Sequence, residues 1–349
     1  MILVLALAAA LWGVGAMMGA PRAVRLNMVL LLYVAVLALH LVLPDAHPLR
    51  MATGESAALW LILGGFVVLV LAYRWGLRRL RARAAGAQTE PAQPTTTGPM
   101  TEVELNRYSR HIVLREIGGP GQVALKNARV LVVGAGGLGA PALQYLAAAG
   151  VGTLGVIDAD VVEGSNLQRQ VIHTDARIGM PKVFSAQAAL EALNPFVTVR
   201  PYHRRFDAEI AGELVAEYDL VLDGTDNFDT RYLVNRTAVA AGVPLISGAL
   251  SQWEGQLSIF DPARGAPCYQ CIFPQAPADG LAPSCAEAGV LGPLPGVVGA
   301  MMAVEAVKLL TGAGAPLRGE MLIYDALYGE SRKIGLARRA DCPVCGSHG

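Results

Sequence analysis

The chain has 349 residues, and its 28 basic and 28 acidic side chains give a formal net charge of zero. This length suits one large domain or two small ones. The balanced charge provides no field that would attract a nucleic acid, so we expect no nucleic-acid binding. The hydrophobic share of 53% and the mean hydropathy of +0.42 are high for a soluble enzyme. Most of this excess lies before residue 84.

Three apolar runs, at residues 1–20, 26–43 and 56–73, account for that excess. A helix needs about 20 apolar residues to cross the hydrocarbon core of a bilayer, and about 17 can suffice. A cleaved secretory signal would carry a basic stretch before its apolar run, but no Lys or Arg precedes the first run here. We therefore predict a membrane anchor over residues 1–83 with three transmembrane helices.

The arginines predict how this anchor is oriented. The first loop carries Arg22 and Arg25 and the second carries Arg50, whereas five arginines follow the third run: Arg74, Arg78, Arg79, Arg81 and Arg83. Basic loops stay in the cytoplasm, so we expect the N-terminus outside and everything after Tyr73 inside, in a multi-pass protein of the inner (cytoplasmic) membrane. Residues 84–99 are rich in Pro, Thr and Ala and predict a flexible linker. We expect the catalytic domain over residues 100–349.

The first motif of that domain is a glycine-rich turn. Residues 128–133 (ARVLVV) predict a buried parallel strand, residues 140–149 a helix, and residues 153–157 a second strand that ends in Asp158. The GAGGLG turn between the first strand and the helix supplies the candidate phosphate-loop glycines Gly134, Gly136, Gly137 and Gly139. Glycines let backbone N–H groups approach phosphate at a helix N-terminus, and an acid at the next strand end can accept hydrogen bonds from a ribose. Taken alone, this pattern fits a nicotinamide-dependent dehydrogenase equally well.

Three later features favour ATP over a dinucleotide. SNLQRQ at 165–170 places Asn166 and Arg169 towards phosphates, and GMPK at 179–182 opens a helix with Lys182. DGTDN at 223–227 closes a strand predicted at 219–222. The cations would neutralise phosphate charge, and Asp226 is our candidate ligand for Mg²⁺. Beyond the glycines, the candidate nucleotide-binding residues are Asp158, Asp160, Ser165, Asn166, Leu167, Gln168, Arg169, Lys182, Asp226 and Asn227.

Four of the five cysteines form two C-x-x-C pairs. Cys268 and Cys271 follow a predicted hairpin over residues 247–261, and Cys342 and Cys345 lie about 70 residues further on. Two such pairs can close one tetrahedral thiolate site, and in a cytoplasmic domain disulfides are the weaker alternative. We predict structural zinc.

The fifth cysteine, Cys285, stands in a Gly/Pro-rich stretch at 274–296. Long loops of this kind are often functional, and a thiol beside an activated carboxylate could accept an acyl group. Adenylation itself needs no thiol, so a catalytic role and a merely tolerated cysteine both stay open.

Taken together, these residues resemble a known family. Residues 107–346 are similar to the MoeB/ThiF/HesA family, the bacterial relatives of ubiquitin-activating enzymes, with the molybdopterin-synthase adenylyltransferases as the nearest branch. The matching stretches are RYSRHIVLREIGGPGQ, GAGGLG, DADVVEGSNLQRQVIHTDARIGMPK, DGTDN, EGQLSIF, CYQC, SCAEAGVLGPLPG and CPVCG.

The resemblance implies an α/β fold: a doubly wound, mainly parallel, Rossmann-like sheet with a C-terminal antiparallel portion and a zinc knuckle. It implies an adenylyltransferase that uses ATP and Mg²⁺, usually as a homodimer. The substrate would be the C-terminal glycine carboxylate of a small ubiquitin-like sulfur carrier ending in Gly–Gly. Adenylation would release pyrophosphate and prepare the carrier for thiocarboxylation in molybdenum cofactor or thiamine biosynthesis.

The resemblance also implies residue roles. Gly136 lies in the nucleotide loop, Asp158 takes the ribose, Asn166, Arg169 and Lys182 hold phosphate, and Asp226 binds Mg²⁺ with Asn227 beside it. Arg110 corresponds to an arginine that enters the neighbouring subunit's site. Cys285 corresponds to a cysteine that is catalytic in some members and dispensable in others. The four paired cysteines correspond to zinc ligands.

Two features depart from the usual family pattern. Membrane helices are not part of it, and no rhodanese domain follows the CPVCG motif, so we expect a separate protein to donate sulfur. Two alternatives remain at this stage. A dinucleotide-dependent oxidoreductase would need a catalytic His, for which His173 and His203 are the candidates, and a catalytically inactive membrane scaffold would be expected to have lost phosphate-binding residues.

Overall fold

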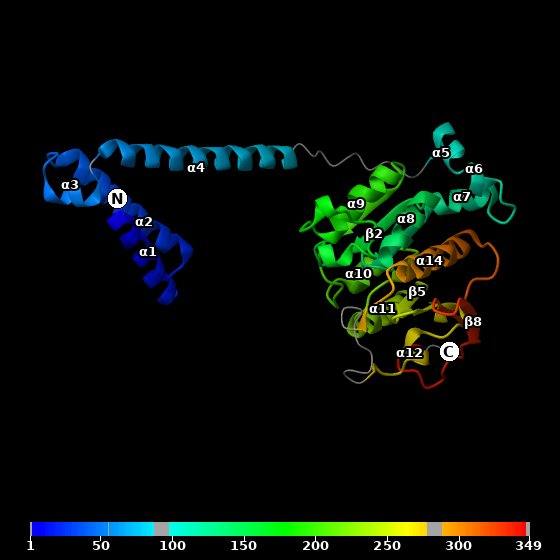
Figure 1. Ribbon diagram of the computed structural model, residues 1–349. Coiled ribbons are helices and arrows are strands. Elements are labelled where there is room, and N and C mark those ends of the chain that lie inside the picture. Colours follow the sequence, from blue (N-terminus) through cyan, green and yellow to red (C-terminus); the bar gives the residue numbers. More distant parts are fainter. Residues whose placement is uncertain (1, 55, 87–97, 278–287, 347–349) are drawn as a thin grey trace. The chain divides into compact units, whose positions relative to one another are not determined.

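The computed structural model describes residues 2–54, 56–86, 98–277 and 288–346 (Figure 1). Its contacts divide the chain into two compact units, Met1–Ala92 and Gln93–Gly349. The two units are described separately below.

The N-terminal unit is helical. Its described residues form four helices: α1 (Ile2–Met17), α2 (Arg22–Val42), α3 (Pro48–Thr53) and α4 (Ala57–Gly86). α2 and the first twenty residues of α4 are long and apolar enough to cross a membrane. α1 has only 16 residues, which span about 24 Å and fall short of a hydrocarbon core of about 30 Å. α1 thus ends at Met17, where a turn leads into α2, three residues before the end expected for the first span at about residues 1–20.

The start of the predicted linker also differs in the structure. α4 continues through its arginines to Gly86, so residues 84–86, which we expected in the linker, are helical. Arginine and alanine are good helix formers, and the first Gly/Thr/Pro-rich residues come only afterwards. Residues 87–97 of the predicted linker lie outside the described residues.

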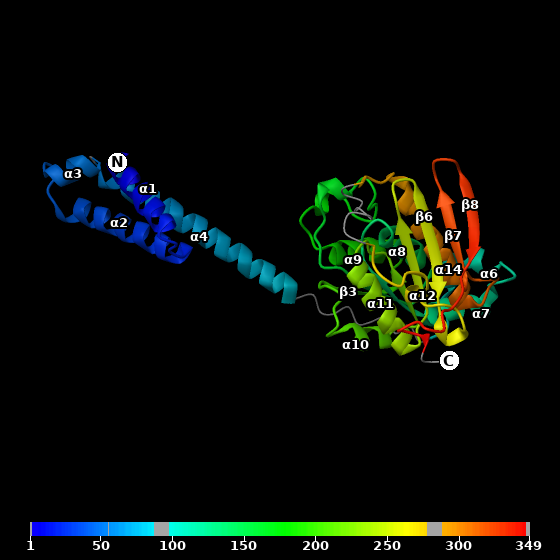
Figure 2. The same ribbon diagram turned by 90° about the horizontal axis from the view of Figure 1, so that it is seen from below.

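The C-terminal unit is built on an eight-stranded sheet with the order β3-β2-β1-β4-β5-β6-β7-β8 (Figures 1 and 2). The first five strands pair in parallel: β1 (Arg129–Val133), β2 (Thr153–Ile157), β3 (Thr198–Tyr202), β4 (Leu220–Asp223) and β5 (Leu245–Leu250). The last three add in antiparallel fashion: β6 (Glu254–Phe260), β7 (Glu320–Asp325) and β8 (Glu330–Gly335). The sheet is thus mixed, with its parallel half next to the predicted antiparallel portion.

Helices cover both faces of this sheet. Among the described residues of the unit, the helices are α5 (Glu102–Arg107), α6 (Ser109–Ile112), α7 (Gly118–Asn127), α8 (Gly139–Ala149), α9 (Lys182–Leu193), α10 (Ala211–Ala216), α11 (Phe228–Ala241), α12 (Tyr269–Ile272) and α14 (Pro293–Thr311). Val130 and Val132 of β1 pack in the core with α7, α8, α9 and α14, whereas Leu131 and Val133 pack in the core with α10, α11 and α12. Because successive strand residues point to opposite faces, β1 is buried on both sides and its sequence is continuously apolar.

α14 shows why apolar length alone does not define a membrane span. It is a third helix that meets the length and hydropathy of a span, yet 44% of that window is buried inside the unit. A Cβ added to Gly299 would come 2.4 Å from the Leu138 carbonyl oxygen at the start of α8. The apolar residues of α14 therefore belong to the core and bring its N-terminal half against the glycine-rich turn.

The elements predicted around the motifs agree closely with the structure. The strand predicted at 153–157 is β2, and those predicted at 128–133 and 219–222 are β1 and β4 within one residue at each end. The predicted hairpin at 247–261 is formed by β5 and β6, which pair from Leu245–Phe260 to Leu250–Gly255.

Candidate nucleotide site and cysteine cluster

The glycine-rich turn connects β1 to α8 and is too tight for side chains. Gly134 has a φ of +94°, which favours glycine, and its N–H donates to the Ile157 carbonyl at 2.9 Å. A Cβ on Gly139 would lie 1.8 Å from the Gly134 carbonyl oxygen, and one on Gly137 would lie 3.0 Å from Pro295 of α14. The turn therefore holds backbone N–H groups at the N-terminus of α8, the arrangement that favours phosphate.

Asp158, at the end of β2, holds this turn in place. One carboxylate oxygen accepts the N–H of Ala135 at 2.8 Å, and the other accepts the N–H of Asp160 at 2.8 Å. Each ionised carboxylate oxygen has room for a further donor. The same group can therefore shape the loop and accept a ribose hydroxyl.

Lys182 is the first residue of α9, as predicted for the GMPK motif. Its ammonium group lies 2.8 Å from a carboxylate oxygen of Asp160. The lysine side chain is only 6% exposed, whereas that of Asp160 is 70% exposed. The buried cation is therefore balanced by a carboxylate at the surface, on the side from which a phosphate would approach.

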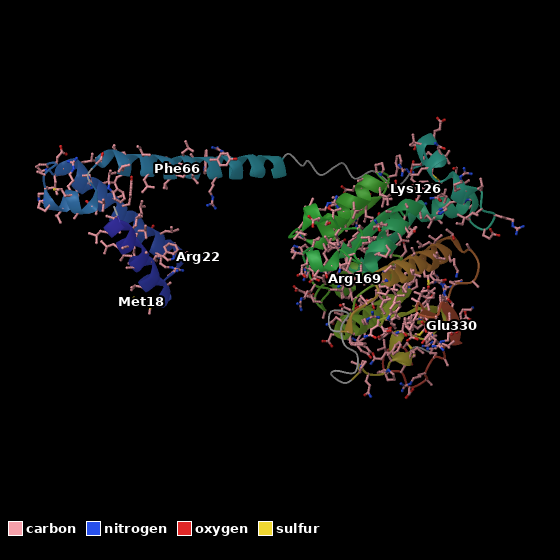
Figure 3. All side chains as sticks on the ribbon, viewed as in Figure 1. Met18, Arg22, Phe66, Lys126, Arg169 and Glu330 are labelled. Atoms are coloured by element: carbon pink, nitrogen blue, oxygen red, sulfur yellow. The ribbon has the colours of Figure 1, made fainter. Side chains whose placement is uncertain are left out.

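Arg169 follows the short 3₁₀ helix Gly164–Asn166. Its guanidinium donates to the side-chain oxygen of Asn166 at 3.1 Å and to the backbone oxygen of Ser165 at 3.4 Å. Its Cγ would lie 3.8 Å from a Cβ added to Gly137. The structure thus brings the SNLQRQ segment against the glycine turn, as the sequence predicted, and Figure 3 labels Arg169 at this place.

The preceding residues of this segment fix it to α14. Gln168 packs closely against Gly292. A Cβ added to Gly292 would lie 2.8 Å from the backbone oxygen of Gln168 and 2.6 Å from its side-chain oxygen. Glycine is therefore required at 292, just before α14. Leu167 caps the end of the 3₁₀ helix through its backbone N–H, so we assign Leu167 and Gln168 to the scaffold of the site.

The DGTDN segment joins β4 to α11 and meets the same turn. A Cβ on Gly224 would lie 3.0 Å from the Gly139 nitrogen. Asp226 is exposed, and its carboxylate makes no hydrogen bond or ion pair with any described residue. Asn227 instead caps α11, because its side-chain oxygen accepts the N–H of Thr230 at 2.9 Å. Of these two neighbours, Asp226 is the one left available to a cation.

Beneath Asp226 lies a buried polar network that sequence reasoning missed. Asp223 is 1% exposed, and it accepts hydrogen bonds from the N–H and the hydroxyl of Thr225 and from the hydroxyl of Ser247. The guanidinium of Arg231 lies 3.8 Å from Asp223 and donates to the backbone oxygens of Thr225 and Gly248. The network fixes the loop that carries Asp226. In the sequence, the only hint of this network is the spacing DGTDN-x₃-R, which places Arg231 on the first turn of α11 after Asp223.

His173 is buried and fully engaged. Its Nε2 lies 2.9 Å from the carbonyl oxygen of Ala135, and its Nδ1 lies 2.9 Å from the Ser185 hydroxyl. A carbonyl only accepts, so Nε2 carries the proton and Nδ1 accepts from Ser185. Burial is the main cause that lowers the pKa of His173. His173 is therefore uncharged and stabilises the glycine turn. His203 is exposed, and its Nε2 is hydrogen-bonded to the Ala159 carbonyl oxygen.

Arg110 is not brought to the other candidate residues within one chain. It is exposed on α6, next to Tyr108, whose ring packs against Gly150 and accepts a hydrogen bond from Asn194. Gly150 ends α8, and the glycine turn begins it, so the two ends are separated by 11 residues, or about 16 Å. Figure 3 labels Lys126 at the α5–α7 end and Arg169 at the other.

A cavity of about 540 Å³ lies away from the nucleotide loops. Its lining includes Ala128, Asp219 and Pro244, each of which directly precedes a parallel strand. Ligands of such sheets bind beyond the carboxyl ends of the strands, where the glycine turn and Asp226 lie. The geometry of those loops therefore defines the candidate site, and this cavity is not part of it.

The four paired cysteines converge into one buried cluster. Their Sγ atoms lie within 4.8 Å of one another, with Cys268 at 3.6 Å from Cys342 and Cys271 at 3.4 Å from Cys345. A tetrahedron with Zn–S bonds of about 2.3 Å has S–S edges of about 3.8 Å. None of these four cysteines is in a disulfide. The set fits the predicted zinc site.

The electrostatics of the cluster agree with that assignment. Burial raises the pKa of Cys268 and Cys271. Burial is the largest effect on Cys342 and acts to raise its pKa, but hydrogen bonds from the N–H groups of Cys345 and Val344, together with those from the Cys268 and Cys271 side chains, lower the pKa of that thiol to about 7. Four thiolates in a buried pocket need a cation, and Zn²⁺ is the ion that prefers four sulfur ligands. Cys285 lies outside the described residues.

Comparison with known proteins places the chain. Residues 108–344 match the ThiF family. The chain belongs to this family. Among relatives, the sulfur carrier protein adenylyltransferase of Thermus thermophilus is 53% identical over 250 residues, which cover 70% of this chain and 92% of that protein. The adenylyltransferase and sulfurtransferase MOCS3 of Mus musculus is 47% identical over 279 residues, covering 77% of this chain and 60% of that longer protein.

A solved structure shows the same fold for this ThiF-family chain. The crystal structure of E. coli MccB with MccA-N7isoASN superposes with a TM-score of 0.62 at 24% identity, covering 69% of this chain and 75% of that one. The expected α/β fold is thereby confirmed: five strands pair in parallel, and three add the predicted antiparallel portion in one mixed sheet. None of the matches described here covers this chain completely, and residues 108–344 exclude the N-terminal helical unit.

Proposed function

We propose that this chain activates the C-terminal carboxylate of a small ubiquitin-like sulfur carrier, ending in Gly–Gly, by transferring AMP to it from ATP. The observation that carries the proposal is the gathering of the candidate residues around the glycine turn. The SNLQRQ and DGTDN segments, which carry Arg169 and Asp226, meet the turn itself, and Lys182 pairs with Asp160 just after β2. The printed activities of the bacterial relative and of MOCS3 support it, because both are adenylyltransferases.

The reaction is a substitution at the α-phosphorus of ATP. A carboxylate oxygen of the carrier forms a bond to that phosphorus, and the bond from the phosphorus to the bridging oxygen of pyrophosphate breaks. Both reactants are anions, so the site must neutralise charge and hold them in line. Arg169 and Lys182 supply the positive charge, the N–H groups of the turn bind phosphate oxygens, and Asp158 positions the ribose. The product is an acyl-adenylate, in which AMP is a good leaving group.

Asp226 is the residue we assign to Mg²⁺. Its carboxylate is exposed and makes no hydrogen bond or ion pair within the part of the chain that the structure describes, and Mg²⁺ is usually bound by one or two carboxylates together with substrate phosphates. When bound, the ion would neutralise charge on the phosphates. Asn227 then acts as the cap of α11 that orients its neighbour.

We further assign Arg110 to the site of a second copy of the chain. Its exposed position at the end of α8 opposite the glycine turn keeps it from its own site, and supports a role across a homodimer interface. The four buried cysteines are assigned to structural zinc, which would tie the residues around 342–345 to α12.

The N-terminal unit is assigned to the inner (cytoplasmic) membrane, with α2 and α4 as spans and the adenylation domain in the cytoplasm. Support comes from the apolar surfaces of these helices and from the arginines after the apolar part of α4. Deleting residues 1–83 tests what the anchor contributes: if it brings the enzyme close to a membrane-bound sulfur donor or consumer, the output of the thiolated product in cells falls. Unchanged output would contradict that role.

Pyrophosphate exchange tests the function directly. The purified chain is incubated with ATP, labelled pyrophosphate and a candidate carrier, first a MoaD-like protein and then a ThiS-like one. We expect exchange with one carrier and none with the same carrier lacking its last glycine. Titration with NADH is the control for the oxidoreductase alternative. The proposal would fail if the chain bound NADH but not ATP. It would also fail if no carrier ending in Gly–Gly, including any that co-purifies with the chain in the presence of ATP, supported pyrophosphate exchange.

The pathway is the finer part of the proposal. We favour a carrier for molybdopterin over one for thiazole, with sulfur supplied by a separate donor protein. A strain lacking the gene should then lose molybdoenzyme activity and keep growing without thiamine. The opposite pattern would assign the chain to thiamine synthesis instead.

A further inference from the structure

The N-terminal unit carries a set of arginines near the ends of two helices. The Tyr33 hydroxyl of α2 donates to the Trp60 backbone oxygen of α4 at 2.7 Å and touches Gly64. Arg25 and Arg22 precede Tyr33 by 8 and 11 residues, or about 12 and 17 Å at 1.5 Å per residue. Arg74 and Arg79 follow Gly64 by 10 and 15 residues, or about 15 and 22 Å. The arginines therefore lie near the start of α2 and towards the end of α4, and each set flanks an apolar stretch.

Aromatic rings accompany these arginines. The guanidinium carbon of Arg25 lies 5.0 Å from the ring centre of Trp12 on α1, and that of Arg79 lies 4.9 Å from the ring centre of Trp75. Tryptophan gathers at the boundary between hydrocarbon and water in membrane proteins. Both residue types, tryptophan and arginine, therefore indicate that Trp12 and Arg25 lie at the boundary between hydrocarbon and water.

The length of α4 leads to the same boundary. The helix has 30 residues and is about 45 Å long, whereas a hydrocarbon core is about 30 Å thick. Its apolar window ends at Gly76. The remaining ten residues continue for about 15 Å, which exceeds the depth of one headgroup layer. The end of α4 must therefore pass through that layer, and it carries Arg78, Arg79, Arg81 and Arg83.

The positive charge of the arginines on α2 and α4 is not neutralised by acidic residues of the unit. Residues 56–89 contain no Asp or Glu, and residues 1–44 contain none either. Among the described residues, Arg22, Arg25, Arg74 and Arg79 form no ion pair, and the Nε of Arg25 is buried without a hydrogen-bond partner. Arg50 differs, because it lies at the other end of the unit and pairs with Asp45 at 2.5 Å.

We propose that Arg22, Arg25, Arg74 and Arg79, here called the arginine collar, bind the phosphate groups of anionic phospholipids in the cytoplasmic leaflet of the membrane. This inference rests on the proposed membrane anchoring. A guanidinium group binds phosphate through two parallel hydrogen bonds, and basic residues next to a membrane span favour anionic lipid. Lipid phosphate would supply the counter-charge that the chain lacks.

Lipid selectivity of the full-length chain tests the collar. The protein is reconstituted into phosphatidylcholine vesicles that contain a trace of spin-labelled phosphatidylglycerol or spin-labelled phosphatidylcholine. The fraction of label slowed by the protein gives the relative association of each lipid. We expect phosphatidylglycerol to associate roughly fivefold more strongly, and this preference to fall at high salt because screening weakens exposed charge pairs.

Three variants separate the collar from charge in general. Replacing the four collar arginines by glutamine should remove most of the preference and leave only what Arg78, Arg81 and Arg83 contribute, and replacing them by lysine should retain more of it. Arg50→Gln is the matched control at the other end and should leave the preference unchanged. Equal association of both lipids with the wild type, no salt dependence, or a preference that is unchanged in the glutamine variant would overturn the inference.

Extraction with alkaline carbonate distinguishes the possible failures. If the chain stays in the membrane but shows no lipid preference, the collar inference is wrong and the anchor stands. If carbonate releases the wild-type chain, the anchor itself is wrong, and the collar inference falls with it. Neither result bears on adenylation, which pyrophosphate exchange measures separately.

Discussion

The nucleotide loops and the cysteine cluster both gather chemistry-bearing side chains from distant parts of the sequence, but they do so in opposite ways. The four thiols of the cluster are buried and point at one another. At the nucleotide loops, Asp226 and Asp160 are exposed, and the buried Lys182 is held by a carboxylate at the surface. A permanent ion requires enclosed ligands, whereas a substrate that enters and leaves requires open ones.

This difference predicts whether a mutation lowers the stability of the domain or its activity. Changes in the cluster should unfold the domain, and changes at the open loops should stop the reaction while leaving the domain folded. The residues beneath the loops lie between these extremes, because Asp223 and Arg231 are as buried as the cysteines but support the open site.

The largest effect is expected from the cluster. Cys342→Ser together with Cys345→Ser removes two thiolates, and structural zinc contributes on the order of 10 kcal/mol in small metal domains. We expect the double variant to lose zinc, measured by elemental analysis, and to lose most of its thermal transition in calorimetry. Cys285→Ser is the matched control, because it removes a thiol without changing either C-x-x-C pair. A double variant with an unchanged melting temperature would show that the cluster is not structural.

The buried pair comes next. Arg231→Ala leaves the Asp223 carboxylate without its cation, and breaking a buried pair from one side typically costs about 3–5 kcal/mol. We expect a clear drop in the free energy of unfolding measured with urea. Asp223→Asn in the same background should recover part of the loss, because it removes the uncompensated charge. Additive effects of the two changes would argue against their coupling.

Asp226 is the sharpest test of the open site. Asp226→Ala should lower pyrophosphate exchange by about 10²–10³, the usual range for removing one electrostatic group from an active site. Its free energy of unfolding should change by less than about 0.5 kcal/mol, since the side chain is exposed. Asp229→Ala, an exposed acid three residues later, is the control and should keep full exchange. An Asp226→Ala rate within a few-fold of wild type would contradict the assignment.

The smallest expected effect concerns pH. Burial holds the pKa of His173 below its usual 6.5, so the unfolded chain binds a proton that the folded chain does not. Stability contributed by the neutral ring is therefore present above pH 6.5 and declines as the pH falls from there towards the folded pKa, by at most about 1.4 kcal/mol per pH unit. His173→Gln should flatten this decline in unfolding experiments, and the exposed His203→Gln should not. Identical slopes for both variants would refute the buried, neutral ring.

The motifs of the site could be predicted from the sequence because each is contiguous. Glycines that cannot be replaced, apolar runs between turns and C-x-x-C pairs all report on their immediate neighbours, and the structure brings them together at strand ends as expected. The mixed sheet was recognisable for a similar reason, since β5 and β6 form a hairpin and the parallel strands alternate with helices.

The supporting residues could not be predicted in the same way. Asp223, Arg231 and Ser247 are single polar residues in three different elements, and only tertiary packing unites them. The pairing of Lys182 with Asp160 spans 22 positions and likewise depends on the fold. The end of α1 was misjudged because composition shows where residues are apolar but not where a helix stops.

The distance between the two cysteine pairs bears on how the protein is made. Cys268 and Cys342 are 74 positions apart, and a ribosome adds about 5–20 residues per second. For roughly 4–15 seconds a nascent chain therefore carries only two of the four paired cysteines, while the whole parallel half of the sheet has already been translated. Under the proposed zinc assignment, all four ligands become available only late in biosynthesis, after the strands that carry the candidate nucleotide loops exist.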